Sequence, residues 1–339
     1  MTQHTDPDVT EFREPDPPDP GAFVELQAGI LWIRLPIPGA LRHINTWLVP
    51  GRRGWFLVDT GMRTDDVQAA WEALDRRLPL ASGLESIVVT HHHPDHYGMA
   101  RWLSERYGVG TAMTERAAAA AAAALQEDPR GRGQPSDGFA ERLGIELDDD
   151  MRSILRGGIY RRIVSGQAPA LPLADEVSGW TVTVHEGHAP GHACLFNAEA
   201  RTLISGDQLL PTISSNVSLY PSNEHGDPLG DYLASLERLS ALHAGTTVLP
   251  AHGRPFRTPH ARIEALRQEH AARLERIREC CMEPRSTQQV AAMLFRLERL
   301  DALNRLLAVT ETLAHLRRLE LAGHATREGT AGTLRWRSN

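Results

Sequence analysis

Four side chains that can bind a metal ion occur within six residues of one another. Residues 90–96 read Thr-His-His-His-Pro-Asp-His, and the four metal-binding types are His91, His93, Asp95 and His96. The preceding residues 86–90 are β-branched and apolar, which predicts a buried strand that ends at the cluster. On a short loop at a strand end, alternate side chains can converge on one point. Imidazole nitrogen with carboxylate oxygen suits zinc or another first-row transition metal.

Three later motifs each offer one more ligand type. They are Gly-His-Ala-Pro-Gly-His at 187–192, Ser-Gly-Asp at 205–207 and Pro-Ala-His-Gly at 250–253. Each comes directly after, or within four residues of, a predicted strand, at 181–184, 202–205 and 246–249 respectively. A single histidine or aspartate in a turn is usually solvated. Four motifs in order, all at strand ends, indicate one common metal site.

Composition limits the cellular class of the protein. The chain has 339 residues, enough for one large domain and a small one. No apolar run approaches the roughly 20 residues that span a bilayer, and the first residues lack the features of a secretion signal. Three cysteines do not make a disulfide framework. We therefore expect a cytoplasmic protein without a membrane partner.

Charge and proline content suggest the domain boundaries. Residues 1–20 hold five prolines and several acids, which predicts a disordered N-terminal arm. From Arg254 onward the chain has 16 arginines against 10 acids, whereas the part before it is strongly acidic. We therefore expect a catalytic domain at 21–257 and a separate C-terminal domain at 258–339.

Helical patterns are expected inside and after the catalytic domain. Residues 113–165 begin with an alanine-rich helix and predict a helical insertion, either a lid over the site or a packing excursion. Residues 258–339 predict a long linker helix, then two helices and a two-stranded hairpin, which is the order of a winged helix. Ser286 is expected to cap the second of these helices, and Gly323 to end the third.

The motifs resemble those of the metallo-β-lactamase-fold hydrolases. With the turn at Leu57–Gly61, five motifs match in order over roughly residues 23–257. The resemblance implies an α/β fold, a four-layered αββα sandwich with the site at one edge. It implies the following ligands: His91, His93 and His188 for one metal ion, Asp95, His96 and His252 for the other, and Asp207 between the two.

The resemblance also suggests roles around the ligands. Asp59 would orient a ligand histidine through its ring N–H. In the 187–192 motif, His188 is the expected ligand, while His192 supports it or has a structural role. His92 is not expected to be a ligand.

The implied chemistry is hydrolysis by a binuclear centre. Two cations about 3.5–4 Å apart share a water and lower its pKa to around 7, so that hydroxide can attack a carbonyl or phosphoryl group. Asp95 is the expected catalytic residue that accepts the proton of this water. The expected cofactors are two divalent metal ions, zinc in first place and iron or manganese as alternatives.

Departures from known branches narrow the substrate. Asp207 stands where class B1 β-lactamases have cysteine, and Leu210 stands where acyl-homoserine lactonases have tyrosine; Tyr220 could replace that tyrosine only if its loop folds back. The 187–192 and 205–207 motifs are similar to those of glyoxalase II-like enzymes. We therefore expect a small-molecule ester, thioester or lactone as the substrate, with substrate-binding residues unknown.

The sequence also supports other hypotheses for the function. One is a single-strand-specific nuclease, since a nuclease branch of the superfamily has a similar tail and this tail carries Arg317, Arg318, Arg327, Arg335 and Arg337. The acidic catalytic part would, however, repel a polyanion. A mononuclear iron oxygenase similar to the persulfide dioxygenases is a further alternative. The C-terminal domain could instead bind DNA or form a homodimer.

Overall fold

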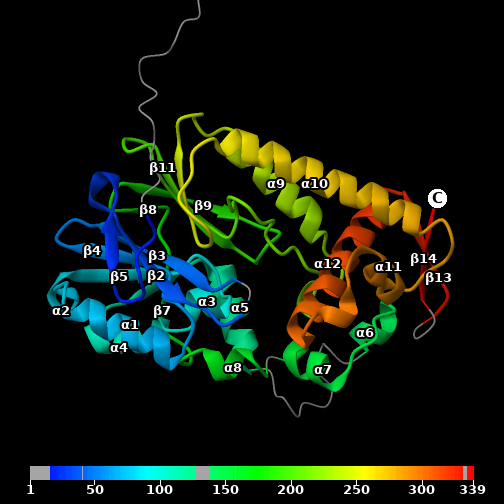
Figure 1. Ribbon diagram of the computed structural model, residues 1–339, viewed down its shortest axis with the longest axis horizontal. Helices are drawn as coiled ribbons and strands as arrows, with labels where there is room; N and C mark the ends of the chain where they lie inside the picture. The colour runs from blue at the N-terminus through cyan, green and yellow to red at the C-terminus, as the bar shows by residue number, and fades with distance from the viewer. Residues whose placement is uncertain (1–15, 40, 127–137, 157, 331–333) are drawn as a thin grey trace, which may run out of the picture.

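Two facing β-sheets form the centre of the computed structural model (Figure 1). The structure describes residues 16–39, 41–126, 138–156, 158–330 and 334–339. The larger sheet has seven strands in chain order: β1 Phe23–Glu25, β2 Leu31–Pro36, β3 His43–Pro50, β4 Trp55–Val58, β5 Leu84–Val88, β6 Thr111–Met113 and β7 Ala170–Pro172. Its strands are antiparallel up to β4 and parallel from β4 to β7.

The second sheet has five strands, and its order places two strand ends side by side. The order is β12 Thr247–Pro250, β11 Thr202–Gly206, β10 His192–Asn197, β9 Trp180–His185 and β8 Glu176–Val177. Strands β11 and β12 are parallel, whereas the other pairs are antiparallel. The carboxyl ends of β11 and β12 therefore meet at one edge of the sheet.

Alternation along the strands builds a core between the sheets and another on each outer face. The inner core joins Trp32 and Trp47 of the first sheet to Leu195 and Ile204 of the second. The neighbouring Ile33 and Leu48 face the other way.

Helices cover both outer faces and complete four layers. On the first sheet lie α1 Asp65–Asp75, the short α2 Leu80–Gly83 and α4 Ala100–Tyr107; on the second lie α9 Pro228–Leu239 and α10 Pro259–Cys280. Helix α1 shows why these segments are helical: Thr64 caps it by accepting a hydrogen bond from the Val67 amide, and its apolar residues recur every three or four positions on the buried face. The predicted αββα sandwich is confirmed.

The C-terminal domain (residues 258–339) has the expected order of elements. After α10 come α11 Thr287–Leu294, α12 Ala302–Leu321 and the hairpin of β13 Ala325–Glu328 with β14 Arg335–Ser338. Ser286 forms a capping box with Gln289. Gly323 adopts φ 72° after α12, and the His324 amide donates to the Leu319 carbonyl, which is a Schellman ending.

The predicted insertion at 113–165 is divided between the two parts of the molecule. It contains α5 Glu115–Gln126, α6 Phe139–Arg142, α7 Asp149–Leu155 and α8 Tyr160–Ile163. Ala117 and Ala121 of α5 pack onto the first sheet, whereas Phe139 and Leu143 belong to the core of the C-terminal domain. Its proline- and glycine-rich stretch at 129–135 lies outside the described residues.

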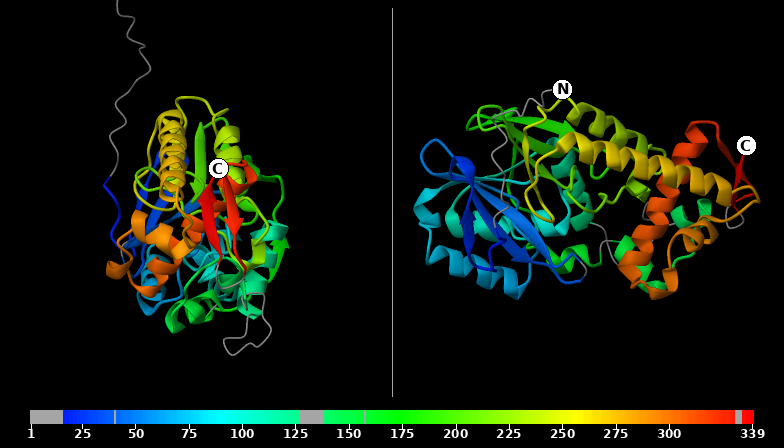
Figure 2. Two further views of the ribbon diagram at one scale, coloured as in Figure 1. Left: turned by 90° about the vertical axis from the view of Figure 1, so that its right-hand side faces the viewer. Right: turned by 45° about the horizontal axis from the view of Figure 1, so that its top comes forward.

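Helix α10 links the sandwich to the C-terminal domain. Figure 2 shows this long helix running from the second sheet to the far hairpin. Its first half packs through Ile263 and Leu266 on the sandwich, and its end packs through Ile277 in the C-terminal core. Of the predicted N-terminal arm, residues 1–15 lie outside the described residues, while Pro18 is buried. Within the described residues, no helix is long and apolar enough to cross a membrane.

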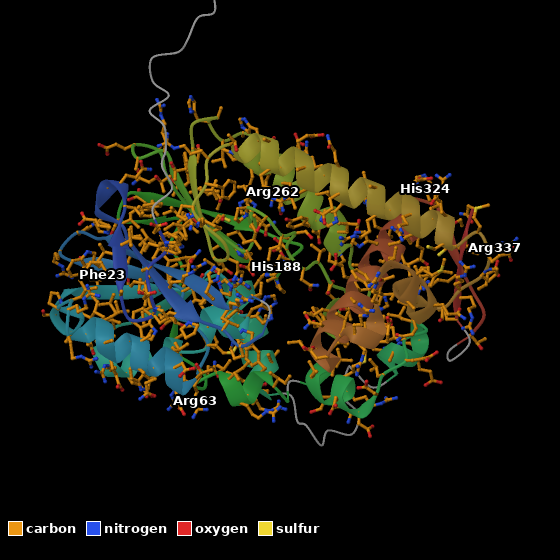
Figure 3. The ribbon with its side chains drawn as sticks, viewed as in Figure 1. Phe23, Arg63, His188, Arg262, His324 and Arg337 are labelled. Atoms are coloured by element: carbon orange, nitrogen blue, oxygen red, sulfur yellow. The ribbon has the colours of Figure 1, made fainter. Side chains whose placement is uncertain are left out.

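The tail arginines are engaged within the chain. Four of the five pair with acids: Arg317 and Arg327 with Glu320, Arg318 with Asp227, and Arg337 with Glu328. Arg335 donates to the Leu334 carbonyl. Figure 3 shows Arg337 at the outer end of the C-terminal domain, far from the centrally placed His188. These arginines therefore form no continuous unpaired basic surface directed at the candidate site.

Candidate metal centre

The predicted ligands come from loops at one edge of the two sheets. Residues 89–93 follow β5, and Pro94 then begins the short helix α3 (Pro94–Tyr97), at whose first position proline is favoured. This turn carries four ligand types on one side of the site. From the second sheet, His188 follows β9, Asp207 follows β11 and His252 follows β12.

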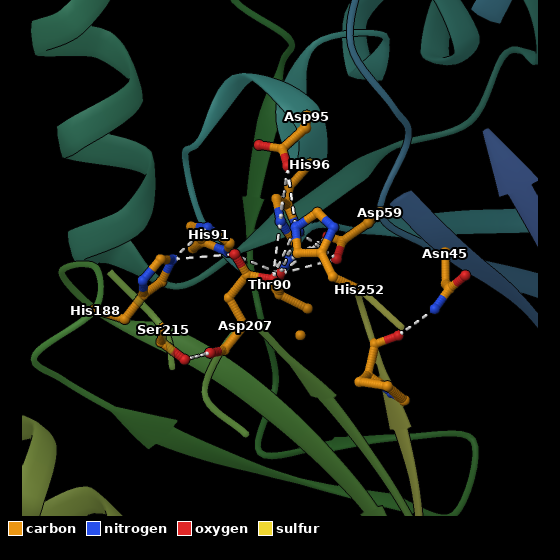
Figure 4. A network of polar contacts seen from close by, with 12 residues as sticks. Asn45, Asp59, Thr90, His91, Asp95, His96, His188, Asp207, Ser215 and His252 are labelled. Atoms are coloured by element: carbon orange, nitrogen blue, oxygen red, sulfur yellow. Dashed lines mark hydrogen bonds and ion pairs between the residues drawn. The ribbon is translucent and has the colours of Figure 1, made fainter. Parts of the chain in front are cut away.

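The structure brings all seven predicted ligands together in two adjoining groups. One group is His91, His93, His188 and Asp207, and the other is Asp95, His96 and His252; within each group, the ligand atoms lie within 4.8 Å of one another. Asp207 contacts both groups, as Figure 4 shows. Its Oδ2 lies 3.4 Å from His188 Nε2, and its Oδ1 lies 3.4 Å from the Nε2 atoms of His96 and His252.

Hydrogen bonds on the far side of the rings orient three of the histidines. His96 Nδ1 lies 2.7 Å from Asp59 Oδ2, His188 Nδ1 donates to the Asn216 carbonyl at 2.8 Å, and His252 Nδ1 donates to the His43 carbonyl at 2.9 Å. Each bond leaves the Nε2 lone pair directed toward the other ligands. This arrangement is the usual support of metal-binding histidines.

Asp59 and His192 hold the ligands from behind. Asp59 Oδ1 accepts a hydrogen bond from the Thr90 amide at 2.8 Å, which ties the end of β4 to the first ligand loop. His192 Nε2 accepts from the Asp207 amide at 3.1 Å, and its ring stacks on that of His91 at 4.8 Å. His92 lies outside both ligand groups.

The protonation states of the buried ligand histidines fit a site that binds cations. Burial lowers the pKa values of His91 and His93 well below their usual range, so their rings are neutral with free lone pairs. Burial opposes protonation of His252 as well, but the Asp207 and Asp95 carboxylates outweigh it and raise its pKa to about 10. Without a metal ion, protons must therefore balance the buried carboxylates, a role that a divalent cation takes over on binding.

Two buried atoms without a hydrogen bond support the same conclusion. His96 Nε2 and Asp207 Oδ1 are buried and make no hydrogen bond to the described residues, and their ion-pair contact with each other is as long as 3.4 Å. Buried polar atoms without partners are rare because their desolvation is not compensated. Both atoms belong to the predicted ligand set, so the donor set and its geometry fit divalent metal ions.

Gly187 lets the chain approach α9 just before the ligand His188. Its φ is 103°, and a Cβ there would overlap the backbone of Tyr232. Gly187→Ala should therefore destabilise the fold by about 2–4 kcal/mol through backbone strain and overlap. Gly108→Ala is the matched control, because Gly108 has φ 67° with nothing within 4 Å and should lose only about 1 kcal/mol. Urea denaturation measures both, and equal losses would contradict the role of close packing.

Apart from Asp59 and His192, the sequence indicated no role for the partners of the ligands. Thr90 was noted only as part of the first motif, although its hydroxyl lies 2.9 Å from Asp59 Oδ2 and 3.1 Å from His91 Nδ1. Asn216 and His43 act through backbone carbonyls, for which the sequence carries no signal. The hydroxyl of Ser215 also donates to the Asp207 carbonyl.

Comparisons with known proteins agree with the fold. The family model of the metallo-beta-lactamase superfamily matches residues 39–252. The family model of the metallo-beta-lactamase-like C-terminal domain matches residues 274–339. The chain is 32% identical to the probable metallo-hydrolase YqjP of Bacillus subtilis, over 86% of this chain and 92% of the relative.

Two crystal structures are similar along almost their whole length. A beta-lactamase domain protein from Burkholderia ambifaria is 35% identical, with 95% of this chain and 96% of that chain covered and a TM-score of 0.85. A metallo-beta-lactamase family protein from Thermus thermophilus is 30% identical, with 92% and 99% covered and a TM-score of 0.76. The fold, the family models and these relatives together establish that the chain belongs to the metallo-beta-lactamase superfamily.

Proposed function

We propose that this metallo-hydrolase uses two divalent metal ions to cleave a small ester, thioester or lactone. The observation that carries the proposal is the pair of adjoining ligand groups with Asp207 in contact with both. With Asp207 shared, each ion would have four protein ligands, and expansion to five-coordination would leave a position for water or substrate at each ion. We propose zinc as the metal, with iron or manganese as alternatives.

The residues have distinct tasks in this proposal. When bound, the two ions would supply a nucleophilic hydroxide at neutral pH and polarise the scissile carbonyl. Asp95 accepts a proton from the attacking water; its carboxylate is ionised, since the effect of burial is outweighed by His96 and His252, which lower its pKa. Asp59 and the Asn216 carbonyl keep the rings of His96 and His188 in the tautomer that leaves Nε2 free.

A small substrate is favoured over a nucleic acid. Four of the five arginines that motivated the nuclease alternative already pair with acids of this chain, which offsets part of their positive charge toward a phosphate backbone. The part of the chain before Arg254 is strongly acidic and would repel a polyanion. The similarity of two motifs to those of glyoxalase II-like enzymes supports a thioester, ester or lactone.

Metal removal tests the proposal. Protein dialysed against a chelator should lose at least 99% of its activity on a panel of thioesters, esters and lactones, and should regain it on addition of about two equivalents of zinc. Elemental analysis of the purified protein identifies the native metal. Full activity after complete metal removal would refute the mechanism. Metal-dependent activity confined to RNA would refute the substrate class.

A further inference from the structure

One loop lies between the C-terminal domain and the metal centre. This loop, residues 214–219, follows Asp207 and contacts α12 near its middle. The Leu219 amide donates to the Thr310 carbonyl at 3.1 Å, and the Thr310 hydroxyl lies 2.9 Å from Ser218 Oγ. Thr310 is fully buried and Ser218 nearly so, so these bonds are shielded from water.

Within the loop, Asn216 connects this contact to a metal ligand. Ser218 Oγ donates to Asn216 Oδ1 at 2.7 Å, and Asn216 Nδ2 lies 3.4 Å from Glu311 Oε2 of α12. Both ends of the Asn216 amide are therefore held. The backbone carbonyl of the same residue accepts the hydrogen bond from His188 Nδ1 at 2.8 Å.

Helix α10 holds the same loop from a second side. Ser214 Oγ donates to Glu269 at 3.1 Å, and Arg273 joins Glu269 to the partly buried Glu311. One residue further on, Ser215 donates to the Asp207 carbonyl; Figure 4 shows this bond beside the ligands. The C-terminal helices thus hold a loop that supports His188 and Asp207.

We propose that the C-terminal domain helps to orient a ligand of the metal centre, and that Thr310 and Ser218 are positioning residues for His188. The inference rests on the proposed metal-dependent function. The Asn216 carbonyl fixes the tautomer and the direction of the His188 ring, and the α12 contact fixes that carbonyl. Loss of such a supporting bond typically weakens metal binding by 10–100-fold. The effect should fall on the ion of the His188 group, because His96 and His252 are oriented by Asp59 and His43 instead.

Thr310→Val and Ser218→Ala test the inference in the full-length protein. Affinity for Co²⁺ and Zn²⁺ is measured by competition with a chelating dye. The variants His93→Ala and His252→Ala serve as references that show which of the two binding positions each measured affinity belongs to. Each test variant should bind the ion of the His91, His93 and His188 group about tenfold more weakly. The ion of the Asp95, His96 and His252 group should keep its affinity within about twofold.

Thr312→Val is the matched control. Thr312 is buried on the same helix, but among the residues that the structure describes its hydroxyl bonds only to the Ala308 carbonyl of that helix, at 2.8 Å. This variant should leave both affinities unchanged, and denaturation midpoints show whether all three variants fold. The inference would be overturned if Thr310→Val and Ser218→Ala bound both ions with wild-type affinity. It would also be overturned if these variants lost affinity for the two ions to the same extent. Wild-type protein that binds no ions would instead refute the proposed function.

Discussion

Asp207→Asn should reduce turnover by about a thousandfold or more while leaving the fold intact. Asp207 places its two carboxylate oxygens toward the two groups, with one oxygen 3.4 Å from His188 and the other 3.4 Å from both His96 and His252. The amide keeps the volume of the side chain but removes the charge that two cations would share. A loss of about 4 kcal/mol of transition-state stabilisation, within the range expected of metal-ion catalysis, corresponds to about a thousandfold in rate.

Asp75→Asn is the control for this substitution. Asp75 pairs with Arg106 at 2.6 Å on α1, away from the site, and such an exposed pair contributes at most about 1 kcal/mol. Activity and metal content are measured for both variants. Asp207→Asn with more than a tenth of wild-type activity and two bound ions would show that the shared carboxylate is dispensable.

The ligands were predictable because each sits in a local motif at a strand end. His188, Asp207 and His252 each follow a strand whose apolar residues are visible in the sequence, next to a glycine or proline that bends the chain. The caps at Ser286 and Gly323 were predictable for the same reason, since capping depends on residues within one turn.

Apart from Asp59 and His192, which lie in the family motifs, the supports of the site were not predictable, because they depend on contacts between distant segments. Ser218 and Thr310 are 92 positions apart, and only packing of α12 against the loop brings them together. Phe139 and Leu143 have the pattern of a helix, but the pattern does not say that the helix joins the C-terminal core.

The central strand β10 was missed for a different reason. It begins at His192, inside a motif interpreted as a ligand loop, and its apolar run from Ala193 to Phe196 is too short to distinguish strand from helix. The pairing of β10 with both β9 and β11 explains why His192 is held rigidly behind Asp207.

Asp59→Asn should keep the fold and weaken the binding of one metal ion. Asp59 has φ 63°, a left-handed conformation that asparagine tolerates as well as aspartate. The amide oxygen can still accept from the Thr90 amide, as Asp59 Oδ1 does at 2.8 Å. We therefore expect a loss of stability of only about 1–2 kcal/mol. Asp59→Ala, in contrast, leaves Thr90 N without its acceptor and removes the carboxylate from His96 Nδ1, which keeps only its longer contact of 3.2 Å with the Thr90 hydroxyl; it should destabilise by roughly 3–5 kcal/mol.

The effect of Asp59→Asn on metal affinity follows from the position of the ring proton of His96. The amide nitrogen would face His96 Nδ1, now 2.7 Å from a carboxylate oxygen, and would donate to it. The ring proton must then move to Nε2, the atom directed at Asp95 and Asp207, where it blocks coordination. Affinity for the ion of the Asp95, His96 and His252 group should fall by about 10–100-fold. Dye competition measures this, and undiminished affinity would refute the orienting role of Asp59. Because His188 is oriented by Asn216, the other ion should stay bound, so this variant and Thr310→Val should weaken opposite halves of the centre.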